Sequence, residues 1–385
     1  MESDTPSQEF LEDFQAGRYQ AGYSYRYFVP NAIDQNWTWK DAQINTMLQA
    51  TSLRLGELNS YARLVPSVHL FTLLYVMSEA VVSSRIEGTA TTMDEALLPF
   101  EEIQIERRDD WKEVQNYSSA LAFAIAELKT LPISSRLLRA THAKLMDGAR
   151  GENKGPGEFR RSQNWIGGSN PGNAAFVPPD HLLVPELMGD LEKFLNNTQI
   201  NLPTLVKAGM AHYQFETIHP FLDGNGRIGR LLIALYLASE KNLDLPLLHI
   251  SSYFEKDRFL YYQKLTQVRE SNDMLGWLKY FLEGVEQAAT RSRDTLTTVL
   301  KLKAEMEAEV KERYRSRATT ALAFLDKIFE SPVMRRDDVQ AWVSLSKRAS
   351  NSLVNAFVSD GYLREVTGKP RNQVFIFDRL VRLFS

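Results

Sequence analysis

The stretch His219-Pro-Phe-Leu-Asp-Gly-Asn-Gly-Arg-Ile-Gly-Arg230 brings a histidine, a carboxylate, three glycines, an asparagine and two arginines together in one short segment. An apolar, helix-like run at 203–218 precedes it, and another at 231–238 follows it. The stretch is therefore predicted to be a tight loop between two helices. The first helix is expected to end at about His219, because a residue before proline is disfavoured in the helical region.

The loop has the chemistry of an anion site. Gly224, Asn225 and Gly226 tolerate positive φ, so their backbone N–H groups can point into one concavity. A helix that begins there adds the positive end of its dipole. Arg227 and Arg230 are three residues apart and share a helical face, where both guanidinium groups suit phosphate oxygens.

Two more side chains of the loop extend this interpretation. Asp223 supplies a hard oxygen ligand, which suits Mg²⁺ beside phosphates. His219 stands at the edge of the loop, where an imidazole can take up a proton. Residue chemistry alone therefore predicts a nucleotide triphosphate site with a histidine base at its edge.

The loop also resembles the signature of the Fic family, His-Pro-Phe-x-Asp/Glu-Gly-Asn-Gly-Arg-x-x-Arg, and matches it position for position. Most characterised members with this form transfer AMP from ATP to a hydroxyl group of a protein side chain. The Doc branch, which phosphorylates instead, has lysine where this chain has Gly226. The resemblance therefore implies a mainly α-helical Fic-type core and favours adenylylation.

The resemblance also implies roles by position. His219 would be the general base for a Ser, Thr or Tyr hydroxyl, and Asp223 would ligate Mg²⁺ between the α- and β-phosphates. Residues 224–227 would form the anion hole, and Arg230 would bind the γ-phosphate. An aromatic residue closes the adenine pocket in the family, which we assign to Tyr262. The implied nucleotide-binding set is Glu87, Asp223, Gly224, Asn225, Gly226, Arg227, Ile228, Gly229, Arg230 and Tyr262.

The segment Ser83-Ser84-Arg85-Ile86-Glu87-Gly88 admits two interpretations. As local structure it is a helix end, with Gly88 just past the last turn. It also resembles the inhibitory motif of Fic proteins, Ser/Thr-x-x-x-Glu-Gly/Asn. By that resemblance Ser83, Glu87 and Gly88 form an inhibitory element. The Glu87 carboxylate would then pair with Arg230 and occupy the γ-phosphate position.

Residues 148–180 are rich in Gly, Asn and Pro, which is typical of a surface loop. Two short apolar pieces within them, 165–166 and 174–177, also fit a β-hairpin. In the Fic family a hairpin flap lies over the site and pairs with the backbone of the target protein. We place this flap at 166–178 and expect the target protein to dock on it. Arg160 and Arg161 are predicted to be structural.

Length and composition limit the classes of protein. The 385 residues suggest two or three domains, and a net charge of −3 gives no overall bias towards nucleic acid. The absence of cysteine excludes disulfides and thiol catalysis. No signal-peptide pattern opens the chain and no apolar run reaches the length of a membrane span. A cytoplasmic protein with no membrane partner is expected.

Helical periodicity and charge divide the chain into five parts. Residues 1–30 are predicted to be an irregular N-terminal arm, 31–110 an N-terminal helical region with the inhibitory helix, and 111–290 the catalytic core with its small hairpin flap. Residues 291–317 carry charges of both signs and are predicted to be an exposed connecting helix. Residues 318–385 are predicted to be a separate module.

This last module resembles a winged helix, an α+β fold, with three helices and then a hairpin that turns at 368–370. Residues 346–358 would be its recognition helix. DNA and protein partners both remain open, because winged helices bind either and the positive excess of the module is mild. Candidate contacts to bases or phosphates are Lys347, Arg348, Ser350, Asn351, Lys369 and Arg371.

The sequence therefore favours a Mg²⁺-dependent protein adenylyltransferase that uses ATP, is autoinhibited by Glu87 and modifies itself as well as a target. One alternative is a DNA-binding regulator whose Fic part senses nucleotide. Another is a Fic enzyme that removes AMP or transfers a different phosphate-linked group. The intact His219 favours an enzyme, because a sensor needs no base. A homodimer is compatible with all of these alternatives.

Overall fold

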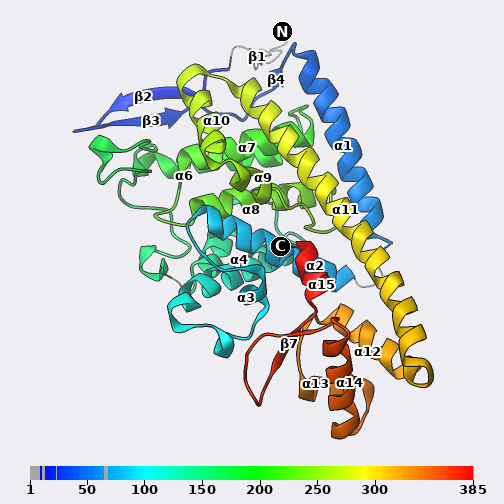
Figure 1. Ribbon diagram of the computed structural model, residues 1–385. Helices are drawn as coiled ribbons and strands as arrows, with labels where there is room; N and C mark the ends of the chain where they lie inside the picture. Colours follow the sequence, from blue (N-terminus) through cyan, green and yellow to red (C-terminus); the bar gives the residue numbers. More distant parts are fainter. Residues whose placement is uncertain (1–8, 11–13, 23, 65–67, 149, 385) are drawn as a thin grey trace.

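The computed structural model describes residues 9–10, 14–22, 24–64, 68–148 and 150–384. It is mainly α-helical with small sheets, as predicted, and Figure 1 labels its elements. Residues 9–271 form β1 (Glu9–Phe10), β2 (Gly17–Ala21), β3 (Arg26–Pro30), β4 (Trp37–Thr38), α1 (Ala42–Ala62), α2 (Val68–Ile86), α3 (Met93–Leu97), α4 (Arg108–Glu127), α5 (Ser135–Leu145), α6 (Val184–Asn196), α7 (Thr204–Ile218), α8 (Asn225–Ser239), α9 (Ser251–Lys256) and α10 (Arg258–Ser271).

The remaining elements begin with one long helix and end in a small mixed unit. They are α11 (Met274–Tyr314), α12 (Ala318–Glu330), β5 (Val333–Arg335), α13 (Arg336–Val343), α14 (Lys347–Ser359), β6 (Arg364–Glu365), β7 (Val374–Ile376), α15 (Asp378–Val381) and the 3₁₀ turn η8 (Arg382–Phe384). Within the described ranges, no helix combines the length and the apolar character that a membrane crossing requires.

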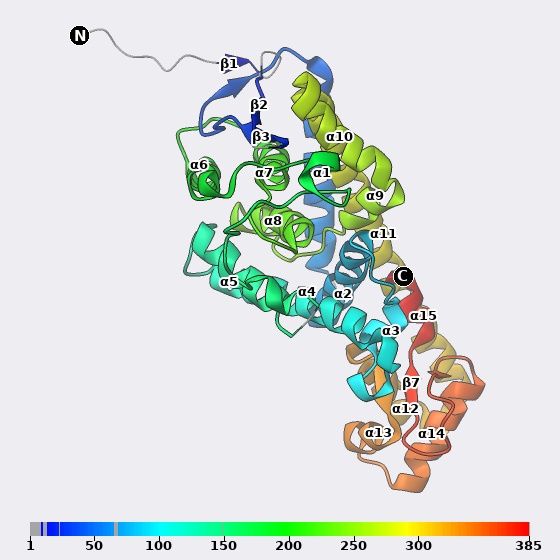
Figure 2. The same cartoon turned by 90° about the vertical axis from the view of Figure 1, so that its left-hand side faces the viewer.

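Helices α7 and α8 form the centre of the fold (Figures 1 and 2). Every residue of α7 from Leu205 to Ile218 is buried, which fits an apolar helix with no solvent face. The long helix α11 runs beside this centre, with α1 packed along it. The loop between α7 and α8 is therefore held by two buried helices.

Gly209 lets α7 and α11 approach each other closely. A Cβ atom at Gly209 would lie 2.9 Å from both Leu278 Cδ2 and Phe281 Cδ1, which are fully buried side chains of α11. The carbonyl oxygen of Gly209 also accepts a hydrogen bond from the Trp277 indole nitrogen at 2.8 Å. The two helices therefore approach this closely because residue 209 has no side chain.

Gly209→Ala is expected to lower the free energy of unfolding by about 1–3 kcal/mol, because the methyl group overpacks this contact. Gly56→Ala is the matched control. Gly56 also lies inside a helix, α1, but a Cβ atom there meets nothing within 4 Å. The control is expected to stabilise by about 0.5–1 kcal/mol, since alanine favours helix over glycine. Urea unfolding measures both, and shifts of the same sign would contradict the packing argument.

The N-terminal region differs from the prediction. Instead of an irregular arm, residues 17–21 and 26–30 form an antiparallel hairpin with Gly17 opposite Pro30. Phe28 anchors this hairpin, since it is buried and its N–H donates to the Val177 carbonyl at 3.0 Å. The hairpin therefore forms through a contact 149 positions away in the chain, which local composition cannot indicate. Residues 1–8, 11–13 and 23 of the predicted arm lie outside the described residues.

The predicted connecting helix is also corrected. Residues 291–314 are not a separate helix, because they continue α11, which runs unbroken from Met274 to Tyr314. The charged stretch keeps a buried stripe at helical spacing, which packs the helix along its length. The helix ends where Arg315 adopts a φ of 42°. The buried residues of this stripe beyond 291 are Ser292, Leu296, Val299, Met306 and Val310.

The C-terminal module has the predicted helices but one strand more than predicted. Its sheet has the order β5-β7-β6, and both pairs are antiparallel. Strand β5 was not predicted, because three residues between two helices carry too little pattern. Lys369, a predicted phosphate contact, instead pairs with Glu102 at 2.6 Å. The identity of the module as a winged helix and its binding of DNA stay predictions.

Candidate functional site

The loop lies between two helix ends, as predicted. Helix α7 ends at Ile218, and His219 follows with φ 50° and ψ 61°. Gly224 has a φ of 76° and precedes the first residue of α8. Residues 225–230, predicted as part of the loop, already belong to α8, so the loop is shorter than predicted. The backbone donors that an anion could use here are therefore the N–H groups of the first turn of α8.

Asn225 shapes the loop through its side chain. Its Oδ1 accepts the Phe221 N–H at 2.8 Å, and its Nδ2 donates to the Phe221 carbonyl at 2.8 Å. The residue is 2% exposed. The amide side chain is therefore a brace across the turn, and only the backbone of Asn225 faces the position predicted for an anion.

His142 holds the loop from α5, a role that the sequence did not indicate. Its ring stacks on Phe221, with centroids 3.8 Å apart and planes within 3°. Its Nε2 donates to the Asp223 carbonyl at 3.0 Å, and its Nδ1 accepts the Gly157 N–H at 2.9 Å. Burial lowers the pKa of His142 to about 4, which keeps the ring neutral in this arrangement.

Arg160 and Asn164 hold the backbone at the histidine. Arg160 Nε donates to the His219 carbonyl at 3.0 Å, and Asn164 Nδ2 donates to the Phe221 carbonyl at 2.9 Å. The guanidinium group of Arg160 also reaches the Pro179 carbonyl and is buried. These contacts agree with the structural role predicted for Arg160. Arg161 is exposed and lies 3.8 Å from Glu158.

His219 has the properties of a base. It is half-buried, and its Nδ1 donates to the Glu216 carbonyl at 3.4 Å. This contact leaves Nε2 with a free lone pair. Burial and the nearby Arg160 cation lower the pKa of His219 to about 4. The imidazole is therefore neutral near pH 7 and able to take up a proton.

Arg227 is fixed by a carboxylate from another helix. It is buried and donates to Glu113 of α4 at 2.9 Å, and it lies 3.6 Å from Asp223. Glu113 is itself buried and also accepts a hydrogen bond from Arg150 at 2.9 Å. Sequence reasoning missed Glu113. A carboxylate just before the apolar stripe of α4 was the available signal.

Arg230 is the most fully enclosed cation of the site. It is 1% exposed, and its Nη2 donates to Glu87 Oε1 at 2.6 Å. Its Nε donates to Ser83 Oγ at 2.8 Å, and Nη2 also reaches the Ser83 carbonyl at 2.9 Å. The end of α2 therefore contacts the loop, and three of the predicted residues come together here.

The Glu87 carboxylate lies against the start of α8. A Cβ atom added at Gly226 would be only 2.3 Å from Glu87 Oε1 and 2.9 Å from Arg230 Nη1. Burial alone would raise the pKa of Glu87, but Arg230 and, more weakly, Arg227 hold that pKa below its usual range. The carboxylate is therefore ionised and occupies the position to which the helix start and Arg230 both point.

The geometry of Gly88 also fits the interpretation of residues 83–88 as a helix end. Its φ is 103° and its N–H donates to the Arg85 carbonyl at 3.0 Å, as expected just after a helix. Arg258, at the start of α10, donates to the Ile86 carbonyl at 2.9 Å. The segment is thus a helix end that also brings a carboxylate to Arg230.

Two predicted nucleotide contacts, Ile228 and Gly229, are directed towards the core. Ile228 is fully buried in the core, and its N–H donates to the Gly224 carbonyl at 3.1 Å. Gly229 faces α7, because a Cβ atom there would lie 2.1 Å from Glu216 Oε1. Its carbonyl accepts a hydrogen bond from His212 at 2.9 Å. Both residues pack α8 against the core, and their assignment to the nucleotide stays a prediction.

Tyr262 lies at the rim of the same region. It is 46% exposed, whereas its neighbour Tyr261 is buried and bonded to His212 at 2.9 Å. Burial raises the pKa of Tyr262 to about 12, with a contribution from the charge of Glu87. A half-exposed ring close to Glu87 is placed where a planar base could stack, which keeps the adenine assignment as a prediction.

The predicted flap forms a single bridge and no regular strands. Ile166 and Phe176 pair, with the Ile166 N–H donating to the Phe176 carbonyl at 2.8 Å. Trp165 and Ile166 are 40% and 37% exposed. The Arg269 guanidinium carbon lies 3.9 Å from the centroid of the Phe176 ring. Phe176, on the second side of the predicted hairpin, is thus held by Arg269. Trp165 and Ile166, on the first side, present apolar side chains to solvent.

Asp223 suits a Mg²⁺ ion that is shared with phosphates. Its side chain is 47% exposed, and one oxygen accepts the Gly224 N–H at 2.6 Å. The described residues place no group of three or more His, Cys, Asp or Glu side chains together as a metal site. Mg²⁺ is commonly bound by one or two carboxylates together with substrate phosphates and water, so a single exposed carboxylate fits this ion.

Two family models match adjoining parts of the chain. The Fic/DOC family matches residues 132–237, and the family described as Fic/DOC family N-terminal matches residues 45–126. The chain is 49% identical over 78 residues to a protein adenylyltransferase Fic of Aedes aegypti and 45% identical over 78 residues to that of Drosophila grimshawi. These alignments cover 20% of this chain and only 14% and 15% of those proteins.

Solved structures share the fold. A Fic family protein from Desulfovibrio desulfuricans superposes with a TM-score of 0.58 and 21% identity, over 89% of this chain and 98% of that chain. A Fic domain containing signaling protein from Bacteroides thetaiotaomicron gives a TM-score of 0.52 and 20% identity, over 65% of this chain and 97% of the other. The chain therefore shares the fold of these Fic proteins, and the Fic/DOC family match lies within this shared fold.

Proposed function

We propose that this protein is a protein adenylyltransferase, which moves AMP from ATP to a hydroxyl group of a target protein. The observation that carries this proposal is the position of His219. A neutral imidazole with a free Nε2 stands in the loop that leads into α8, and the buried Arg227 and Arg230 lie in the first turns of that helix. The names of the relatives from Aedes aegypti and Drosophila grimshawi agree with this activity.

The proposed reaction needs a base and a set of phosphate ligands. The target hydroxyl oxygen attacks the α-phosphorus of ATP, and its proton passes to His219 Nε2. The bond from the α-phosphorus to the bridging oxygen breaks, and pyrophosphate leaves with the electron pair. The N–H groups at the start of α8 and the guanidinium groups of Arg227 and Arg230 bind the phosphate oxygens.

Asp223 would hold Mg²⁺ in this site, and the ion would neutralise phosphate charge when bound. The carboxylate is exposed and oriented by the Gly224 N–H. Its backbone is fixed by His142, which keeps the ligand in place without using the carboxylate itself.

The same geometry supports autoinhibition by Glu87. The Glu87 carboxylate pairs with Arg230 at 2.6 Å and lies close to Gly226 at the start of α8. A γ-phosphate that binds Arg230 has to displace this carboxylate, because both are anions that use the same donors. ATP is therefore expected to react only in molecules in which Glu87 has moved away.

The target protein is proposed to dock on the segment 166–178. The pair Ile166–Phe176 leaves other backbone groups of this segment for a strand of the target. Recognition through backbone hydrogen bonds selects for an extended segment more than for a particular sequence. The exposed Trp165 ring offers an apolar contact beside it.

The proposal is tested by mass and by label position. The full chain carrying Glu87→Gly is incubated with Mg²⁺ and ATP, labelled in separate reactions at the α- and the γ-phosphate. Adenylylation of the chain itself or of an added target adds the mass of AMP and retains only the α-label. Incorporation of the γ-label alone would identify phosphorylation. Incorporation of neither label, with ATP bound and cell extract supplied as target, would contradict the proposal.

A further inference from the structure

The last turn of the chain packs directly on the helix that carries Glu87. Phe384 in η8 is 4% exposed, and its ring lies 5.0 Å from the ring of Tyr75 in α2. Its carbonyl accepts a hydrogen bond from Ser78 Oγ at 2.6 Å in a buried environment. Figures 1 and 2 both place the C-terminus beside α2. The two ends of this contact are 306 positions apart in the chain.

Ser78 and Glu87 belong to one rigid element. Nine helical residues span about 13 Å, so a displacement at Ser78 is carried along α2 to its end. Helix α2 continues to Ile86, and Glu87 follows directly with its N–H bonded to the Ser84 carbonyl at 3.0 Å. The C-terminal contact is therefore mechanically linked to the Arg230 ion pair.

The C-terminal module also holds the segment that follows Glu87. Arg364 of β6 pairs with Asp94 of α3 at 2.5 Å. Lys369, in the turn after β6, pairs with Glu102 at 2.6 Å. The module therefore contacts the chain before Glu87, through η8, and after it, through these two ion pairs. A body that touches both sides of a short segment restricts where that segment can move.

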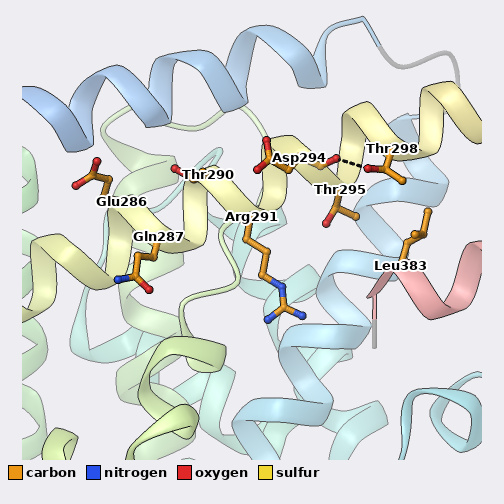
Figure 3. Close-up of a pocket in the computed structure, with 8 residues that line it drawn as sticks. All are labelled: Glu286, Gln287, Thr290, Arg291, Asp294, Thr295, Thr298 and Leu383. Carbon is orange, nitrogen blue, oxygen red and sulfur yellow. Dashed lines mark hydrogen bonds between the residues drawn. The ribbon is translucent and has the colours of Figure 1, made fainter.

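The contact of η8 is accessible from one side. A pocket of about 490 Å³ lies between α11 and Leu383, the residue before Phe384. Figure 3 shows the Leu383 side chain beside Thr295 and Thr298, at the end of a row of polar side chains on α11. Solvent and ligands therefore reach the edge of the turn, which is held on α2 by the single buried residue Phe384.

We propose that the C-terminal module is the regulator of the site, and that docking of η8 on α2 holds Glu87 in its inhibiting position. This inference rests on the proposed function. An event that lifts η8 from α2 lowers the fraction of molecules with the Glu87–Arg230 pair, because the two contacts share one helix. By linkage, ATP that displaces Glu87 weakens the docking of η8.

The test uses the full chain with Phe384→Ala, which removes the anchoring ring, and Ser78→Ala, which removes the hydrogen bond. Each is expected to raise the initial rate of AMP transfer by about five- to tenfold, in the lower range of measured couplings between sites. Neither substitution is expected to raise the rate further in a protein that already carries Glu87→Gly, because the Glu87 carboxylate that η8 is proposed to hold in place is then absent. Gln340→Ala, an exposed change on α13, is the control for the module and leaves the rate unchanged.

Hydrogen exchange of the α2 amides, measured without ATP, tests the coupling between η8 and α2 independently of the proposed function. Faster exchange at residues 79–86 in Phe384→Ala supports the link, whatever reaction the site performs. Unchanged exchange overturns it.

If Glu87→Gly is active but neither Phe384→Ala nor Ser78→Ala is faster than wild type, the inference fails and the proposed function stands. If no variant transfers AMP, the proposed function fails, and exchange alone decides the coupling. Should Phe384→Ala not fold, Ser78→Ala carries the test.

Discussion

Replacing His219 with alanine in the Glu87→Gly protein is expected to lower AMP transfer by about 10²–10⁴-fold, the usual contribution of a general base. The imidazole acts on the attacking hydroxyl and not on ATP, so ATP affinity is expected to stay within about twofold. The backbone at this position is held by Arg160 and Asn164, and these bonds go to carbonyl groups that alanine retains. The loop therefore keeps its shape without the ring.

Initial rates with α-labelled ATP and equilibrium binding of ATP check the two halves of this prediction. His181→Ala is the control, because His181 lies just before α6, where it pairs with its neighbour Asp180 at 3.3 Å. A His219→Ala protein that transfers AMP as fast as its parent would remove histidine from the mechanism. A protein that has lost ATP binding as well would show that the ring supports the loop instead.

Glu87→Gly is expected to raise transfer by about 10- to 100-fold over wild type. A hydrogen bond between charged groups contributes about 1.5–3 kcal/mol, and each 1.4 kcal/mol corresponds to a factor of ten. Removal of the carboxylate frees Arg230 for the γ-phosphate, while Ser83 still holds the guanidinium group through Nε. The cation therefore stays in place after the change.

Glu87→Gln separates charge from shape. The amide keeps the length of the side chain but loses the negative charge, so an increase smaller than that of Glu87→Gly is expected. Rates at saturating ATP, together with the ATP concentration that gives half the maximal rate, measure both variants. Equal rates for wild type and Glu87→Gly would leave Glu87 as part of a helix end, which the geometry of Gly88 also fits.

The sequence indicated the parts of this site that depend on neighbouring residues. The end of α7 at His219 follows from the proline after it, and the start of α8 follows from the glycine at 224. The mainly helical fold follows from apolar periodicity. The pairing of Glu87 with Arg230, 143 positions apart, came from family resemblance, because no local pattern connects them.

The rest depends on contacts between distant segments. His142, Glu113 and Asn164 hold the loop from three different elements, and each looks ordinary in its own stretch of sequence. The side chain of Ile228 packs into the core, because position within a motif does not say which face of α8 a side chain occupies, and its assignment to the nucleotide stays a prediction. Helix α11 was divided in the prediction, since charge on its exposed face masked the buried stripe.

The φ of 50° at His219 has a consequence for how this protein evolves. A side chain in left-handed backbone costs about 1 kcal/mol relative to glycine, so a glycine here would make the fold more stable. The backbone at this position thus prefers glycine to the histidine that stands there. Mutation and selection for stability alone would therefore favour loss of the proposed base.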